Sequence, residues 1–419
     1  MPGYQVRMIV MDQGERMPLM IGEDGVPLFR TTEWIVTARR AANPAANTLQ
    51  ANCYALKFLY LWADAQGVDI EARMHSGDYL RPNEISSLAA AAQKHLDELD
   101  VAPPAKPVKP PKVVSLEQVR MKAPRPVRSV QKDTAANRLR TVADYLAWLG
   151  QMGNLDLDLQ TSALRKEALG QMIANLTTTI PKTRGRNVVG KREAPPQDVI
   201  DRLLAVIEPG APENPWADFG LQIRNRLLVH MFYGLGIRRG EALGIKITDH
   251  IDFRRKRLLI ARNADDAEDP RRQQPLAKTR DRWLPLKDGL IDMIQDYMIQ
   301  IRRKVPNAAK HQFLFVSHQL GKPLSLSGES RVFEQLRQRT EVPDYLTTHV
   351  LRHAWNDAFS RLIDAKGVAS EREAQLRSEM MGWSPTSGTA ATYNRRKIRE
   401  DAERFLLEHQ KVLLPGGSE

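Results

Sequence analysis

The stretch at residues 103–132 limits most strongly how this chain can fold. It contains seven prolines and eight Lys or Arg residues against a single acid, Glu117. Proline lacks a backbone donor and like charges repel one another, so this stretch cannot bury much apolar surface. The 419 residues are therefore predicted to form two or three domains. The stretch itself is interpreted as a linker or a DNA-facing arm, and a spacer without contacts is the alternative.

The charge balance favours an anionic partner. The chain has 62 Lys and Arg against 50 Asp and Glu, a formal net charge of +12. Such an excess favours DNA, RNA or an anionic membrane, although a merely basic soluble protein is equally compatible. The sequence contains neither a long apolar run nor a secretory signal, which predicts a bacterial cytoplasmic, nucleoid-associated protein without a membrane partner.

Cysteine usage agrees with a reducing compartment. The one cysteine, Cys53, excludes an internal disulfide and any multi-cysteine metal site. Because Cys53 lies on the apolar stripe of a predicted helix, it is interpreted as a buried small hydrophobe.

The first half of the chain changes from strand-like to helical patterns. Short apolar runs at 5–11, 17–21 and 26–29 predict a small β-meander within residues 1–40. Apolar residues at helical spacing predict helices from Thr48 onward, over 84–99 and over 133–149.

A second basic passage at 181–196 is predicted to link two domains. It ends in Pro195-Pro196, which opens a helix near Gln197. Its cations are candidate DNA contacts: Lys182, Arg184, Arg186, Lys191 and Arg192.

The segment from Leu227 to Ile245 is predicted to form two helices that meet at a glycine-containing turn. Arg238 follows the turn and Glu241 comes three residues later, so the two side chains share a helical face. A guanidinium held by a carboxylate presents its N–H donors in a fixed bidentate geometry that suits a phosphate oxygen. A surface ion pair would show the same spacing.

Thr347 is predicted to cap a helix that carries His349, Arg352 and His353. His349 and Arg352 then lie on one face near the positive end of the helix dipole, where an anion would meet an imidazole and a guanidinium. Gly382-Trp383 follows downstream, and Tyr393 comes ten residues after Trp383. Taken singly, these residues favour a structural capping pair, a core tryptophan and a half-buried surface tyrosine.

In their order along the chain, these pieces resemble the tyrosine recombinase, or phage integrase, family. That family shows G-L-R-x-x-E, a hairpin lysine, H-x-L-R-H, L-G-H or L-G-W, and then a tyrosine. The matching residues are Arg238 with Glu241, Lys278, His349 with Arg352 and His353, Trp383 and Tyr393. The match is strong over roughly residues 190 to 410 and rests on pattern alone over 48–175.

The resemblance implies a fold and a domain order. We expect a multidomain, mainly α protein, with a helical core DNA-binding domain at 41–180 and a mixed α+β catalytic domain at 197–396. The catalytic domain is expected to combine helices with a small antiparallel sheet. Residues 397–419 are expected to form a C-terminal helix and tail that dock on a neighbouring protomer, and packing on their own domain is the alternative.

The resemblance also implies roles. Tyr393 would attack the scissile phosphate and form a 3′-phosphotyrosyl bond, while Arg238 and Arg352 hold the non-bridging oxygens. Lys278 would protonate the leaving 5′-oxygen. His349 would act as acid or base, Trp383 would donate a hydrogen bond to phosphate, and Glu241 would orient Arg238. No metal, nucleotide or other cofactor is expected.

Two departures from the family pattern matter. Trp383 stands where histidine is commoner, so a donor to phosphate remains but an acid or base does not. Lys278 matches the K-T…P-L pattern, yet the preceding acidic loop leaves Arg280 or Lys287 as alternatives for the lysine position, and Arg280 is also a candidate DNA contact.

The expected partners are double-stranded DNA, further copies of the chain in a tetramer on two DNA sites, and possible accessory DNA-bending or directionality proteins. A mobile genetic element is the expected context. A type IB topoisomerase, a catalytically silent DNA-binding or architectural protein, and an RNA-binding protein are the alternatives. The last would need aromatic and basic residues interleaved on a sheet, and no such array is evident at 6% aromatic residues.

Overall fold

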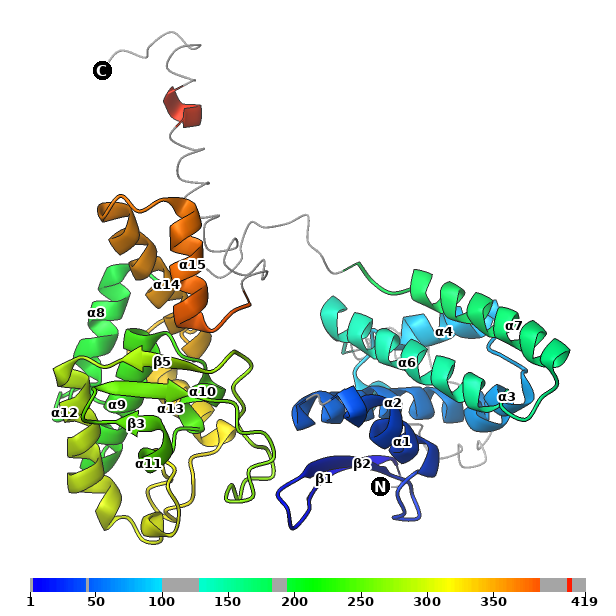
Figure 1. Ribbon diagram of the computed structural model, residues 1–419, viewed down its shortest axis with the longest axis horizontal. Helices are drawn as coiled ribbons and strands as arrows, with labels where there is room; N and C mark the ends of the chain where they lie inside the picture. The colour runs from blue at the N-terminus through cyan, green and yellow to red at the C-terminus, as the bar shows by residue number, and fades with distance from the viewer. Residues whose placement is uncertain (1–2, 43–44, 100–127, 183–193, 385–404, 409–419) are drawn as a thin grey trace, which may run out of the picture. The chain divides into compact units, whose positions relative to one another are not determined.

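The computed structural model describes residues 3–42, 45–99, 128–182, 194–384 and 405–408 (Figure 1). The chain divides into two compact units, Met1–Val188 and Val189–Glu419. The described residues are mainly helical and form two small antiparallel sheets, which confirms the predicted fold class. In the described parts, no helix combines the length and apolar character needed to cross a membrane.

The first unit packs helices around a β-hairpin. Its strands are β1 (Gln5–Val10) and β2 (Arg16–Ile21), paired so that Gln5 faces Ile21. The helices are α1 (Phe29–Trp34) with π and 3-10 continuations at Ile35–Arg39 and Arg40–Ala42, α2 (Ala46–Gln66), α3 (Ile70–Ser76), α4 (Pro82–Ala91), a 3-10 turn at Leu96–Glu98, α6 (Lys132–Met152) and α7 (Leu159–Thr178).

One apolar core joins β2, α2 and α6, so the hairpin is part of the helical unit and shares its core. Met20 of the hairpin, Leu56 of α2 and Leu146 of α6 are all buried in this core. Cys53 is buried beside the carbonyl oxygen of Pro18, as predicted, and burial raises the pKa of its thiol to about 12.

Two local predictions were wrong. The run at 26–29 contributes a single bridge, Ile21 to Pro27, and the chain then enters α1, because Trp34 and Ile35 are buried in the helical core. The helix predicted over 84–99 stops at Ala91. Arg138 donates hydrogen bonds to the carbonyl oxygens of Ala92 and Lys94, and these contacts take the place of further helix.

The second unit packs its helices and a three-stranded sheet around one apolar core, to which α9 contributes Leu228 and Phe232. It comprises α8 (Gln197–Val206), α9 (Phe219–Leu235), α10 (Arg239–Leu243), α11 (Ile247–His250), β3 (Ile251–Asp252), β4 (Arg257–Ile260), β5 (Arg282–Pro285), α12 (Asp288–Asp296), a π turn (Tyr297–Ile301), 3-10 turns (Arg302–Lys304, Ala308–Lys310), α13 (Leu326–Arg339), α14 (Thr348–Ala365) and α15 (Ser370–Met381).

Strand order in this sheet is β3-β4-β5, with Leu258 opposite Leu284. Figure 1 shows β5 on the side of the sheet nearest α15 and β3 on the side of α11. The sheet therefore brings the connection between β4 and β5 next to the end of α15. The expected lysine and the expected tryptophan belong to these two segments.

Candidate active site

Arg238 follows a tight turn at the end of α9. Gly236 closes the helix with a left-handed backbone (φ 60°), and Arg238 then caps α10 in an extended conformation. A side chain on Gly236 would meet the rings and methyl groups of Trp355 and Met381, so this position favours glycine on two grounds. The two helices predicted around this turn are confirmed.

Glu241 holds Arg238 from inside the protein. Its carboxylate accepts the backbone N–H of Arg238 at 3.0 Å and lies 3.4 Å from Nη1 of the same residue. The Glu241 side chain is fully buried, while the Arg238 side chain is 33% exposed. The pair is therefore no ordinary surface ion pair, because the buried carboxylate orients a guanidinium that opens to solvent.

Arg282 of β5 completes this ion pair and was not predicted. Its Nη2 lies 2.9 Å from Oε2 of Glu241, and both side chains are buried. Burial disfavours the charged carboxylate, but the Arg282 guanidinium and the hydrogen bonds that Glu241 accepts outweigh it and hold the pKa of Glu241 below its ordinary value. The alternation of the strand was the available signal: Trp283 is exposed, so its neighbour Arg282 faces inward.

Lys278 lies beside this cluster on the connection between β4 and β5. Its neighbour Thr279 donates a hydrogen bond to Oε1 of Glu241 at 2.7 Å, while the Lys278 side chain is exposed. Arg280 instead donates through Nε to the carbonyl oxygen of Trp383 at 3.1 Å. Lys287 lies beyond β5, where it caps α12. Lys278 therefore stays the predicted residue for the lysine role.

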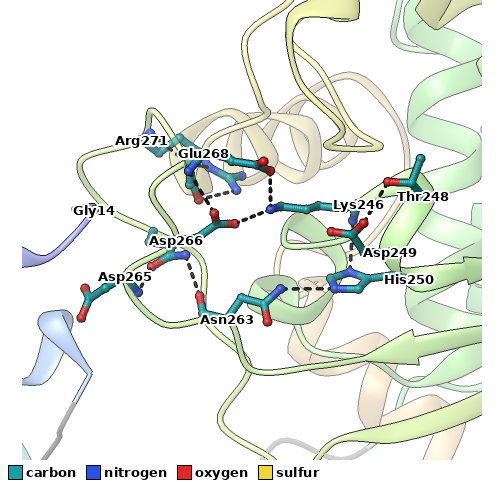
Figure 2. Close-up of polar contacts among 12 residues, drawn as sticks. Gly14, Lys246, Thr248, Asp249, His250, Asn263, Asp265, Asp266, Glu268 and Arg271 are labelled. Atoms are coloured by element: carbon teal, nitrogen blue, oxygen red, sulfur yellow. Dashed lines mark hydrogen bonds and ion pairs between the residues drawn. The ribbon is translucent and has the colours of Figure 1, made fainter. Parts of the chain in front are cut away.

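The acidic loop before Lys278 is anchored by buried cations (Figure 2). Lys246 Nζ lies 2.9 Å from Asp266 and 2.7 Å from Glu268. Arg271 pairs with both carboxylate oxygens of Asp269 and donates to the carbonyl oxygen of Leu243, the last residue of α10. The loop is thereby tied to the helix that carries Glu241.

A second layer of polar contacts stiffens the same loop. The Gln274 amide donates to the carbonyl oxygen of Asn263 at 2.7 Å and accepts the backbone N–H of Asp265 at 2.9 Å. Nearby, Nδ1 of His250 accepts the backbone N–H of Lys246, and burial lowers the pKa of His250 (Figure 2). The imidazole is therefore kept neutral, as a structural acceptor.

Helix α14 begins with the predicted threonine cap. The Thr347 hydroxyl accepts the N–H of Val350, which places His349 in the first turn with an exposed side chain. The imidazole of His353 stands edge-on to that of His349, with ring centroids 4.5 Å apart. An anion at this end would meet the helix dipole and two imidazoles.

Arg352 points inward from the same helix. It is buried, and its Nη1 donates to the carbonyl oxygen of Gly236, in the turn before Arg238. One helical turn on, Nε1 of Trp355 donates to the carbonyl oxygen of Gly234 at 3.1 Å. Through these two bonds α14 holds the turn that leads to Arg238.

Trp383 packs against Arg352. Its buried ring lies 5.6 Å from the Arg352 guanidinium carbon, and its backbone N–H closes α15 on the carbonyl oxygen of Ser378. The segments that carry Arg238, Lys278, Arg352 and Trp383 are therefore joined by one connected set of contacts.

Several candidate residues lie outside the described residues: Tyr393, Arg184, Arg186, Lys191 and Arg192. So do most of the stretch 103–132, the linker 181–196 and the tail 397–419. Lys182 is described and exposed, as are Phe405 and Leu406 of the predicted C-terminal helix. Their roles stay predictions.

Chemically, the described segments are rich in groups that can carry positive charge. The described contacts tie together the segments that carry two guanidiniums, an exposed lysine and two imidazoles, groups of the kind that stabilise developing negative charge. Among the described residues, no three His, Cys, Asp or Glu side chains converge as metal ligands would.

Comparison with known proteins places one family over this part of the chain. Residues 196–399, which include every candidate from Arg238 to Tyr393, match the phage integrase family. Over this region the chain matches the family of the tyrosine recombinases, and the resemblance seen in the sequence is confirmed.

Individual relatives are distant. The chain is 21% identical over 218 residues to tyrosine recombinase XerD of Halalkalibacterium halodurans, covering 51% of this chain and 66% of that protein. It is 28% identical over 188 residues to the XerC-like tyrosine recombinase of Caldanaerobacter subterraneus, covering 41% of this chain and 45% of that protein. The chain thus spans less than two thirds of the length of these relatives.

Solved structures align loosely. The XerH site-specific recombinase bound to difH substrate, in a pre-cleavage complex, aligns with a TM-score of 0.36 and 17% identity over 68% of this chain and 74% of that one. The XerA recombinase aligns with a TM-score of 0.34 and 14% identity over 93% of this chain and 98% of that one.

Proposed function

We propose that this chain is a site-specific DNA recombinase that cuts and rejoins DNA through Tyr393. The observation that carries the proposal is the link between two candidate phosphate-binding residues. Arg352 donates to the backbone of the turn that presents Arg238, and Glu241 fixes the other side of Arg238. Two guanidiniums fixed relative to one another suit the two non-bridging oxygens of one phosphate.

The proposed reaction is an exchange of one phosphodiester for another. The phenolic oxygen of Tyr393 bonds to phosphorus as the bond to the 5′-oxygen breaks, which leaves a 3′-phosphotyrosyl link and a free 5′-hydroxyl. Lys278 gives the leaving oxygen its proton, and His349 takes up the proton of the phenol. Attack by a 5′-hydroxyl of another strand reverses these steps and joins the strands. The reaction consumes no nucleotide, because the phosphotyrosyl link conserves the phosphodiester bond energy.

Arg238 and Arg352 act on the transition state. They neutralise charge that grows on the phosphate oxygens, and Trp383 adds a hydrogen-bond donor beside Arg352. A free tyrosine, with a pKa near 10, is a weak nucleophile at neutral pH, so these cations also favour its phenolate.

The proposal extends to partners. A +12 chain with basic stretches at 103–132 and 181–196 suits double-stranded DNA, and recombination of two sites suggests four copies of the chain, with residues 397–419 docking between them. A mobile genetic element, with accessory DNA-bending proteins, is the proposed setting.

The first experiment tests for the covalent intermediate. DNA fragments retained by the purified protein are selected from a random pool, rebuilt as nicked duplexes and incubated with wild type and Tyr393→Phe. Wild type is expected to give a protein–DNA band on a denaturing gel, and Tyr393→Phe is not. A band for both variants would move the nucleophile to another residue.

The second candidate function is a catalytically silent DNA-binding protein. Retention of DNA in a native gel without any covalent band from wild type would favour it over the recombinase. Relaxation of supercoiled plasmid lacking the selected sites would instead favour a type IB topoisomerase.

A further inference from the structure

We infer that Arg282 is a positioning residue for strand transfer, setting the distances between the three segments that carry Arg238, Lys278 and Trp383. This inference rests on the proposed function. Arg282 itself is buried and has no route to a phosphate, so it acts through its neighbours.

The guanidinium of Arg282 makes a contact in each of three directions. Nη2 lies 2.9 Å from Oε2 of Glu241, Nη1 donates to the Thr279 hydroxyl at 2.8 Å, and Nε donates to the carbonyl oxygen of Met380 at 2.6 Å. These three partners come from α10, from the β4–β5 connection and from the last turn of α15.

Each partner is close in sequence to a candidate catalytic residue. Glu241 holds Arg238, Thr279 directly follows Lys278, and Met380 comes three residues before Trp383. Since a planar guanidinium has fixed donor directions, one side chain determines how these three segments stand relative to one another.

Close backbone packing makes the arrangement intolerant of displacement. The backbone N–H of Arg280 donates to the carbonyl oxygen of Gly382 at 3.0 Å. A Cβ on Gly382 would lie 2.8 Å from the carbonyl oxygen of Arg280 and 2.9 Å from Nη1 of Arg282. The β4–β5 connection and the turn before Trp383 therefore move together or not at all.

A lysine at position 282 cannot reproduce these contacts. Its ammonium keeps the charge that Glu241 needs, but a compact ammonium group on a flexible stem cannot reach an ion pair, a hydroxyl and a carbonyl in three fixed directions. Arg282→Lys should therefore preserve the buried charge pair and lose the geometry.

The test compares Arg282→Lys with Arg302→Lys in the full-length protein. Arg302 is a matched control: it is also buried and donates to the carbonyl oxygens of Phe313, Ala308 and His311, away from the candidate site. The readouts are DNA affinity in a native gel and the rate of covalent product formation on a nicked duplex. Arg282→Lys is expected to bind DNA within about threefold of wild type and to cleave about 100-fold more slowly. Arg302→Lys should cleave within about threefold of wild type.

A modified substrate separates positioning from general loss of structure. With sulfur in place of the bridging 5′-oxygen, the leaving thiolate needs no proton, so misplacement of Lys278 matters less. Both Arg282→Lys and Lys278→Ala should recover at least about tenfold of their lost rate on this substrate. Thr279→Val, which removes the hydroxyl without changing the size of the side chain, should show a smaller loss with the same recovery, and it serves if Arg282→Lys does not fold.

The inference is overturned if Arg282→Lys cleaves like wild type, if Arg302→Lys loses as much activity, or if sulfur substitution restores nothing. Where Arg282→Lys does not fold, a wild-type cleavage rate for Thr279→Val overturns it instead. A wild type that forms no covalent product at all would instead refute the proposed function, and this inference with it.

Discussion

Arg352 of α14 donates a hydrogen bond to the carbonyl oxygen of Gly236, a residue 116 positions earlier in the chain. Gly236 ends α9 and lies two residues before Arg238. The second candidate phosphate-binding arginine therefore supports the backbone that presents the first. A change at Arg352 should disturb both, and the effects of changing the two arginines should not be additive.

Arg352→Lys should remove most cleavage activity while DNA binding persists. Lysine keeps the positive charge but lacks the second N–H donor group of the guanidinium. Loss of one hydrogen-bond donor to a transition state costs about 10²–10³-fold in rate. The measurement is the rate of covalent product formation on a nicked duplex. Arg361→Lys is the control, because Arg361 lies on the same helix in an exposed pair with Asp357. Equal rates for Arg352→Lys and wild type would contradict the proposed role.

Gly236→Ala should destabilise the second unit by about 1–3 kcal/mol. The cause is twofold: a left-handed backbone (φ 60°) and a Cβ pressed against Trp355 and Met381. Gly234→Ala, two residues earlier within α9, meets nothing within 4 Å and should be neutral or stabilising by up to about 1 kcal/mol. Urea unfolding followed by circular dichroism distinguishes the two, and similar midpoints would show that the turn is not strained.

Asp269→Asn should destabilise the protein by about 3–5 kcal/mol, since it removes the negative charge that pairs with the buried Arg271 guanidinium. Arg202→Gln, which breaks an exposed pair with Glu213, should cost less than about 1 kcal/mol. Urea midpoints for both variants test the contrast. A small effect of Asp269→Asn would mean that the ion pair anchoring the acidic loop does not stabilise the folded protein.

Glu329 makes stability depend on pH. Burial raises the pKa of this carboxyl to about 7, and Arg239 and Ser330 offset only part of that rise. The pKa of Glu329 is higher in the folded protein than in the unfolded chain. The contribution of protonated Glu329 to stability is therefore complete below the unfolded-state pKa and is lost as pH rises through about 7.

Glu329→Gln removes this dependence. Relative to wild type, the variant should gain stability between pH 5 and pH 8, by up to about 3 kcal/mol at the upper end. Urea unfolding of both proteins across this pH range gives the difference between their free energies of unfolding. The titration of the buried histidines contributes equally to both proteins and cancels in this difference. A difference that stays constant with pH would show that Glu329 keeps an ordinary pKa.

Some of the site could be predicted from the chain alone because the contacts are local. The pairing of Arg238 with Glu241 and the threonine cap before His349 depend on helical spacing of three residues, which any helix of this sequence must reproduce. The order of the motifs likewise predicted the family, and the match over residues 196–399 confirms it.

Other features were decided by packing between distant segments. Arg282 meets Glu241 across 41 residues, and neither the burial of that pair nor the third contact at Met380 follows from spacing. The strand predicted at 26–29 failed for the same reason, since burial of Trp34 and Ile35 in the core of the first unit favoured a helix there. Local periodicity thus determined which side chains share a face, whereas the tertiary structure decided which faces are buried together and which charge each buried group meets.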